Sequence, residues 1–199
     1  MRGDLSACAE PLTVWSPHAY ELGRTISRHL LLDAGDVRTQ LIGFDVPVHR
    51  IGADLLLPAH VDVSLPERAV LAAMGIGADL RRPWVLANWS AAWVYLGGAP
   101  PERPAVAVPH RARTRGGVTL HQFSLSPADI FTIGGCPVMS PSRVAADLLR
   151  TGPDDPGVIA ALRTLLERGW TQKTVVRERI HEIGPGRNSR RSLDALERL

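Results

Sequence analysis

Lysine is almost absent from this 199-residue chain: Lys173 is the single one, and the other 22 basic residues are arginine. A GC-rich coding sequence is the first explanation of this bias, and the bidentate contacts of guanidinium with phosphate and carboxylate are the second. Metal-dependent nucleases need clustered carboxylates, often with a lysine. Here Asp129 and Asp147 are isolated and no D-x-n-E-x-K series occurs, which argues against that class.

Cysteine is equally scarce, because Cys8 and Cys136 are the only two and neither lies in a C-x-x-C pair. This excludes a disulfide framework and favours a reducing, cytoplasmic setting. The longest apolar stretch, residues 69–78, contains two glycines and is too short to cross a bilayer. The chain opens without the pattern of a signal peptide. We therefore expect a cytoplasmic protein without a membrane partner.

The common patterns of catalytic and cofactor sites are also missing. The seven histidines show neither H-x-x-x-H nor H-E-x-x-H spacing, and the sequence has no G-x-x-x-x-G-K-[ST] or G-x-S-x-G. Ser140 follows an expected strand and opens a helix, but Pro141 identifies it as a helix cap rather than a nucleophile. We expect no catalytic residue, no metal and no cofactor.

The charge is unevenly distributed. Residues 1–100 hold eight Arg against ten Asp and Glu, a net of −2, whereas residues 101–199 carry +5, so the whole chain is at +3. An acidic partner should therefore be attracted more strongly by the second half.

Helical periodicity begins at residue 19 and predicts a helix that ends near residue 35, followed by a short helix over 36–42. Extended segments are expected at 46–51, 55–57 and 61–63, with a turn at 52–54. Two helices followed by a two-stranded turn indicate a small winged helix-turn-helix-like unit. An α+β cap subdomain without DNA contact is the alternative. Ser64 and Glu67 form a capping box that starts the next helix, which ends at Gly75.

The second half is predicted to be a mixed α+β domain that ends in helices. Ser90 is expected to cap a helix over 91–96, and strands are expected at 105–108 and 118–123, joined by a basic hairpin tip at 109–117. Gly134 and Gly135 predict a tight turn between strands at 130–133 and 136–139. Helices should follow at 141–149, 157–168, 172–183 and 189–198. The fold class is thus α+β, with units at 1–63 and 64–199.

Two basic clusters and one aromatic cluster remain as candidate binding sites. Arg111, Arg113 and Arg115 alternate along the expected hairpin tip, and Arg187, Arg190 and Arg191 begin the last helix. Each cluster is either an anion-binding surface or a solvated loop. The aromatic residues between 84 and 95 either pack in the core or form a patch for a partner.

Three stretches of the second half resemble the AbiEi-family antitoxins. Residues 89–97 (WSAAWVYLG) are similar to the helix of that family, and residues 106–130 resemble its strand, Arg-rich turn, strand and Leu-x-Pro-x-Asp run. The most specific similarity is residues 135–148 (GCPVMSPSRVAADL), in which Arg143 and Asp147 occupy the motif's Arg and Asp positions. Their spacing permits an ion pair within one helix.

The resemblance implies a non-enzymatic antitoxin of a type IV toxin–antitoxin system in phage defence. Its winged unit would bind operator DNA upstream of its own operon, and the domain at 64–199 would counteract a cognate nucleotidyltransferase toxin. Operator contacts would come from Arg24, Arg28, Arg38 and Arg50, assisted by Arg111, Arg113 and Arg115. The antitoxin surface would include Arg187, Arg190 and Arg191. The alternative is a protein-interaction module of the same family that has lost DNA binding.

Overall fold

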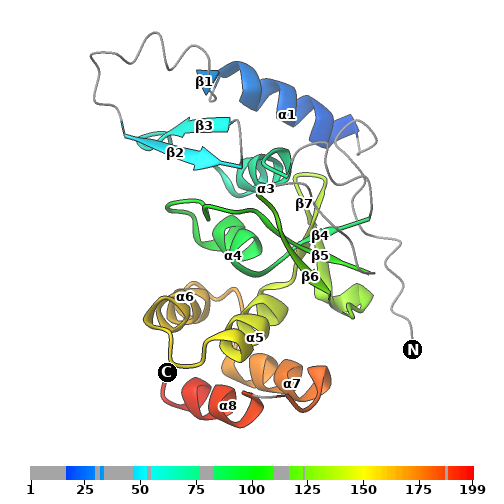
Figure 1. Ribbon diagram of the computed structural model, residues 1–199, viewed down its shortest axis with the longest axis vertical. Helices are drawn as coiled ribbons and strands as arrows, with labels where there is room; N and C mark the ends of the chain where they lie inside the picture. Colours follow the sequence, from blue (N-terminus) through cyan, green and yellow to red (C-terminus); the bar gives the residue numbers. More distant parts are fainter. Residues whose placement is uncertain are drawn as a thin grey trace.

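The computed structural model describes residues 17–29, 32–33, 47–52, 55–76, 83–109, 117–122, 124–186 and 188–199. These residues contain seven α-helices and two sheets, so the predicted mixed α+β class is confirmed. From top to bottom, Figure 1 shows a small sheet with its helix, a five-stranded sheet with helices beside it, and a group of C-terminal helices. In the described ranges no helix has the length and apolar character needed to cross a membrane.

The N-terminal sheet is antiparallel, with the strand order β1-β3-β2, and Figure 1 shows α1 beside it. Its elements are α1 (Pro17–His29), β1 (Leu32–Asp33), β2 (Val48–Ile51) and β3 (Leu55–Pro58). The expected two-stranded turn is confirmed by β2 and β3. The segment at 61–63 follows β3 without forming a strand, and the expected helix at 36–42 lies outside the described residues.

The prediction of one helix from residue 19 to near residue 35 is wrong at its end. The helix α1 stops at His29, and Leu32 and Asp33 pair with Leu56 and Leu55 of β3. Helical spacing in a sequence is a local signal, whereas the partner strand lies more than twenty residues further along the chain. Pairing with that strand therefore overrides the local periodicity.

The helix α3 (Leu65–Met74) connects the two sheets. It begins as predicted, because the Ser64 amide and hydroxyl donate to Glu67 Oε2 over 2.8 and 2.6 Å. The helix packs against α1 on one side, and against α4 (Asn88–Leu96) and the central sheet on the other. Its residues 69–73 are all buried. It therefore packs against elements of both units that the sequence suggested.

The larger sheet has the strand order β6-β5-β4-β8-β7. Its strands are β4 (Val85–Leu86), β5 (Ala105–Val108), β6 (Thr119–Gln122), β7 (Ile130–Ile133) and β8 (Cys136–Met139). The predicted hairpin of β7 and β8 is confirmed, with Ile133 opposite Cys136 and both turn glycines in the left-handed region. The short helical turn η2 (Pro127–Asp129) precedes β7.

The basic hairpin tip expected at 109–117 is wrong, because β5 and β6 are parallel. A segment between adjacent parallel strands is a crossover and not a hairpin turn. Alternation of apolar residues indicates a strand but carries no information on its direction. Arg111, Arg113 and Arg115 themselves lie outside the described residues.

The cap assigned to Ser90 is also wrong, because α4 begins two residues earlier at Asn88. The hydroxyl of Ser90 instead accepts a hydrogen bond of 2.8 Å from the Ala105 amide. It therefore ties the helix to the first residue of β5, which is a long-range contact that no local capping rule predicts.

The C-terminal helices agree with their predicted positions to within about two residues. They are α5 (Pro141–Thr151), α6 (Pro156–Glu167), α7 (Lys173–Ile183) and α8 (Ser189–Glu197). Ser140 is the N-cap of α5 and Pro141 its first residue, as the sequence indicated. The helix α5 lies in the centre of this group and contacts α4, α6, α7 and α8.

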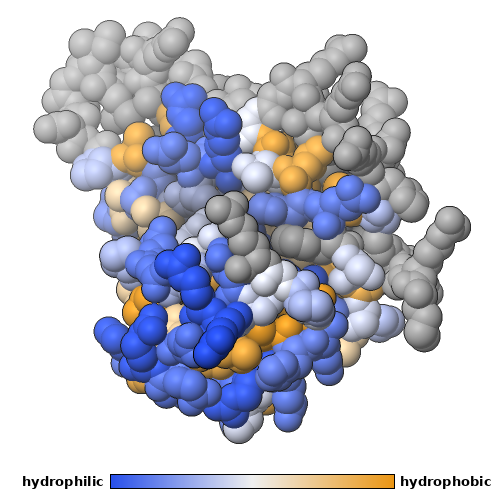
Figure 2. All heavy atoms as spheres, turned by 60° about the horizontal axis from the view of Figure 1, so that its bottom comes forward, coloured by the Kyte–Doolittle hydropathy of each residue, from blue (hydrophilic) through white to orange (hydrophobic). Residues whose placement is uncertain are grey.

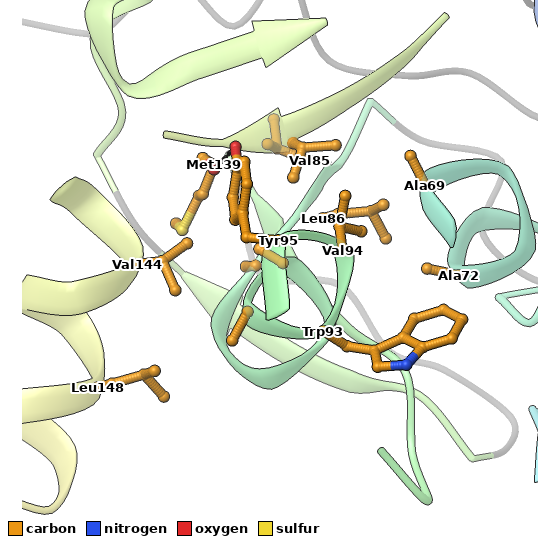
Figure 3. Packing of buried hydrophobic residues seen from close by; sticks show 14 of the residues in the cluster. Ala69, Ala72, Val85, Leu86, Trp93, Val94, Tyr95, Met139, Val144 and Leu148 are labelled. Atoms are coloured by element: carbon orange, nitrogen blue, oxygen red, sulfur yellow. Dashed lines mark hydrogen bonds between the residues drawn. The ribbon is translucent and has the colours of Figure 1, made fainter. Parts of the chain in front are cut away.

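One hydrophobic core extends through both units. Figure 3 shows α4 in its middle, with Trp93 directed toward α3 and Tyr95 toward β8, where its hydroxyl donates to the Met139 carbonyl over 2.7 Å. The same buried cluster includes Ile26 of α1 and Leu57 of β3. The core therefore continues across the boundary expected at residues 63 and 64.

Candidate functional site

The stretch at 135–148 forms one structural unit. The turn at Gly134 and Gly135 reverses the chain, β8 runs through the buried centre of the sheet, and Ser140 with Pro141 starts α5. Every residue of β8 is buried, and α5 buries the face that carries Arg143 and Asp147. The two residues that stand out in the sequence motif thus point into the protein.

Arg143 and Asp147 form the predicted ion pair, and the pair is almost completely buried. Arg143 Nε donates to Asp147 Oδ2 over 2.9 Å, and the two residues are 5% and 4% exposed. Arg143 Nη1 also lies 3.3 Å from Asp129 Oδ2 and donates to the Ser124 carbonyl over 3.2 Å. One guanidinium therefore joins α5 to the segment that precedes β7.

A second arginine completes the cluster. Arg179 Nη1 of α7 lies 3.1 Å from Asp129 Oδ1 and 2.7 Å from Glu182 Oε2. The first of these contacts is electrostatic and lacks hydrogen-bond alignment. We call Asp129, Arg143, Asp147 and Arg179 the buried ion cluster. It fixes η2, α5 and α7 to one another.

The electrostatics of this cluster are those of a structural site. Burial raises the pKa of Asp147, and the charge and hydrogen bond of Arg143 oppose that shift. Charges with so little access to solvent are favourable only while they are paired. A substrate could not reach them without opening the core. The assignment of Arg143 and Asp147 to a structural motif agrees with this geometry.

Asp129 and Arg179 were missed by the sequence reasoning, which treated Asp129 as isolated. One local signal was available. Ser126 donates to Asp129 Oδ2 through both its amide and its hydroxyl, each over 2.8 Å. This repeats the pattern of Ser64 and Glu67, in which an acidic residue follows the capping serine by three positions. Nothing local indicates Arg179.

The structure does not bring the predicted DNA-contacting arginines together in one described surface. Arg24 on α1 is 47% exposed, with Nη1 3.5 Å from Glu21 Oε1, and Arg50 on β2 is exposed. Arg28 lies on α1, but its side chain is outside what the structure describes. Arg38 also lies outside the described residues, as do the three arginines of the 109–117 segment.

Two of the predicted antitoxin-surface arginines are placed. Arg190 and Arg191 are exposed on α8, whereas Arg187 lies outside the described residues. Arg191 forms an ion pair with Asp154, which is also 3.5 Å from Arg198. Figure 2 brings these helices forward and shows a mostly hydrophilic face with small apolar areas. The positive charge of α8 is thus partly balanced by its neighbours.

The aromatic cluster is divided between core and surface. Trp84, Trp93 and Tyr95 are at most 4% exposed, so most of the cluster packs in the core. Trp89 is 39% exposed, as is Trp170, whose ring lies 5.2 Å from that of Tyr95. Trp89 and Trp93 therefore do not share one buried face, although they are four residues apart.

A cavity of about 310 Å³ lies where the N-terminal sheet meets α3 and α4. Sequence reasoning did not find it, because its lining comes from segments that are distant along the chain. The lining residues are His49, Leu57, Ala59, His60, Val61, Asp62, Val63, Arg68, Trp93, Gly97, Gly98 and Ala99. We call this the junction cavity.

Arg68 is the half-buried cation of the junction cavity. Its Nε donates to the Val94 carbonyl over 2.8 Å, and its Nη1 donates to the Val63 carbonyl. Burial lowers the pKa of Arg68; Asp62 partly opposes this, and the nearby Arg168 lowers it further. Arg168 donates to the Leu96 carbonyl over 2.9 Å, so two guanidinium groups gather at the C-terminal end of α4.

Among the residues described, no group of three His, Cys, Asp or Glu side chains could hold a metal ion. Comparison with known proteins adds no relative: no protein-family model matches the chain, and no curated protein or solved structure matches it.

Proposed function

We propose that this protein is an antitoxin of a type IV toxin–antitoxin system that binds operator DNA through its N-terminal unit and represses its own operon. The observation that carries the proposal is the antiparallel order β1-β3-β2, with α1 beside this sheet (Figure 1). A winged helix-turn-helix has a short strand before its recognition helix and a hairpin after it. Here β1 precedes residues 34–46, and the hairpin of β2 and β3 follows them.

The candidate phosphate contacts lie on this same unit. Arg24 and Arg50 are exposed on α1 and β2, and Arg28 and Arg38 belong to the same part of the chain. Arginine suits this role because its planar guanidinium matches the geometry of phosphate oxygens. The basic segment at 111–115 would add contacts from the second unit.

The antitoxin part of the proposal concerns the C-terminal domain, 64–199. Its support is the resemblance of residues 135–148 together with their position as a single unit, from the β7–β8 turn to the middle of α5. Its partner would be a cognate nucleotidyltransferase toxin, with Arg187, Arg190 and Arg191 as the contact surface. The protein would act in the cytoplasm without catalysis, metal or cofactor.

Fluorescence anisotropy with a labelled duplex from the protein's own upstream region tests the DNA-binding part. We expect binding at about 50 mM salt and weaker binding by Arg24→Ala and Arg50→Ala. Arg163→Ala removes an exposed arginine from α6 and should leave affinity unchanged. Absence of binding by the wild-type chain, or equal loss in the Arg163→Ala control, would sink the operator proposal.

The second candidate function is a protein-interaction module that has lost DNA binding. The exposed ring of Trp89 favours it, because exposed tryptophan is common at binding hot spots. Co-purification with the product of the neighbouring gene distinguishes the two functions. This candidate predicts a stable complex that Trp89→Ala weakens, with no retention on operator DNA.

A further inference from the structure

The junction cavity contains groups that the proposed function does not use. Its walls come from the β2–β3 hairpin, the segment leading to α3, and the C-terminal end of α4. It thus lies between the unit expected to bind DNA and the rest of the protein. Its volume is near the lower limit of typical small-molecule sites.

The chemistry of the lining is divided into an apolar part and a polar part. Leu57, Val61, Val63 and Trp93 supply apolar surface. The indole N–H of Trp93 already donates to the Gly98 carbonyl over 2.8 Å, so this side chain can offer a ligand only its ring. An apolar molecule or an aromatic ring would therefore find contacts on this side.

The polar part of the lining contains one cation, Arg68, and one carboxylate, Asp62, with a second cation, Arg168, nearby. Arg68 lines the cavity, and Arg168 is close enough for the two cations to destabilise each other. Arg68 Nε and Nη1 donate to carbonyls, whereas Nη2 has no hydrogen-bond partner in the part of the chain that the structure describes. Two imidazoles, of His49 and His60, can also donate, and Asp62 is the one carboxylate of the lining.

We propose that the junction cavity binds a small organic anion, with an apolar body and one carboxylate or phosphate group, of about ten non-hydrogen atoms. The anionic group would pair with Arg68, and the apolar body would lie against Trp93 and Leu57. Nη2 of Arg68, unpartnered among the described residues, would give the anionic group a charge-assisted hydrogen bond.

Such a ligand would contact the β2–β3 hairpin and α4 at once. Because the hairpin belongs to the proposed winged unit, such a ligand would regulate operator binding. This step rests on the proposed function. A ligand that bridges the hairpin and α4 changes DNA affinity if the hairpin must move to bind DNA.

The test of binding uses the protein alone. Benzoate and phenyl phosphate are the anionic probes, and benzamide is the neutral probe, all at constant ionic strength. We expect one or both anions to raise Tm, by about 3 °C when the probe is at ten times its Kd, and benzamide to have no effect.

Matched variants locate the effect. Ala99→Phe and Ala59→Phe place a ring at exposed positions that line the cavity, and Ala160→Phe places one on the exposed face of α6. We expect the first two to abolish the Tm shift and the third to retain it. These variants avoid Arg68, whose removal could unfold the end of α4.

Each outcome decides the proposal. Absence of a Tm shift with both anions at about 10 mM, an equal shift with benzamide, or an unchanged shift in both cavity variants overturns it. The regulatory part is measured separately, as operator affinity with and without the probe. If the probe leaves operator affinity unchanged, the regulatory part of the proposal is overturned, whereas the binding of the anion in the cavity is not affected. Absence of operator binding under all conditions overturns the proposed function but leaves the cavity assignment intact.

Discussion

Gly134→Ala should destabilise the protein far more than its surface position in a turn would indicate. A β-carbon on Gly134 would lie 2.6 Å from the carbonyl oxygen of Pro66, in the first turn of α3. The backbone there has a φ of +57°, which costs a residue with a side chain about 1–2 kcal/mol. The contact adds an overpacking cost of about 1–3 kcal/mol, because the atom it meets belongs to a helix backbone.

Gly169→Ala is the matched control. Its φ is +71°, and a β-carbon there meets no atom within 4 Å. Its cost should therefore be the conformational part alone, about 1–2 kcal/mol. The difference between the two variants, about 1–3 kcal/mol, isolates the close approach of the β7–β8 turn to α3.

Urea denaturation followed by far-ultraviolet circular dichroism measures both variants against wild type. We expect a lower midpoint for Gly134→Ala than for Gly169→Ala, with similar slopes. Equal midpoints would refute this expectation, because they would mean that a β-carbon on Gly134 does not clash with the Pro66 carbonyl of α3. Gly52 extends the argument to the other end of α3, since its β-carbon would lie 2.2 Å from the Gly75 carbonyl oxygen.

Three further predictions concern buried groups. Arg143→Ala should cost about 3–5 kcal/mol of unfolding free energy, since it leaves the Asp147 carboxylate buried without its partner; a cost below 1 kcal/mol in urea denaturation would refute this. Burial lowers the pKa of His121. The contribution of its neutral imidazole to the free energy of unfolding is therefore fully present above pH 6.5 and is lost as pH falls toward the folded-state pKa. The fall in Tm between pH 7.5 and 5.5 should therefore be smaller in His121→Gln, and identical falls would contradict the assignment. Burial raises the pKa of Cys136 to about 12, so in a Cys8→Ser background its thiol should react with a thiol reagent at pH 8 only after denaturation; rapid reaction of the folded protein would contradict its burial.

The elements that could be predicted from the sequence are those with local signals at their ends. Ser140 with Pro141 marked the start of α5, and the paired glycines marked the β7–β8 turn. Gly97, with a φ of +74°, follows the last residue of α4 as expected. Caps and turns depend on a few adjacent residues, so one sequence is enough to find them.

The elements that could not be predicted depend on distant partners. Leu32 is in a strand because Leu56 pairs with it, and the parallel direction of β6 depends on its alignment with β5. The hydroxyl of Ser90 is used by Ala105 rather than by the start of its own helix. Each result follows from tertiary contacts that override a local preference.

The candidate site shows the same division. The spacing of Arg143 and Asp147 predicted an ion pair within one helix, and the pair is present. Its burial and its connection to Asp129 and Arg179 come from the packing of α5 against α7 and η2. The junction cavity has no local signature, because residues from 49 to 99 line it only after folding.

The salt dependence of operator binding is the most direct test of DNA binding by the N-terminal unit. We expect log affinity for the upstream duplex to fall linearly with log salt concentration. Each phosphate contact contributes about 0.9 to the slope. The Arg24→Ala, Arg50→Ala double variant should therefore have a slope shallower by about 1.8, and Arg163→Ala should keep the wild-type slope. A wild-type chain that does not bind the duplex at about 50 mM salt, or a double variant with an unchanged slope, would contradict operator binding through Arg24 and Arg50.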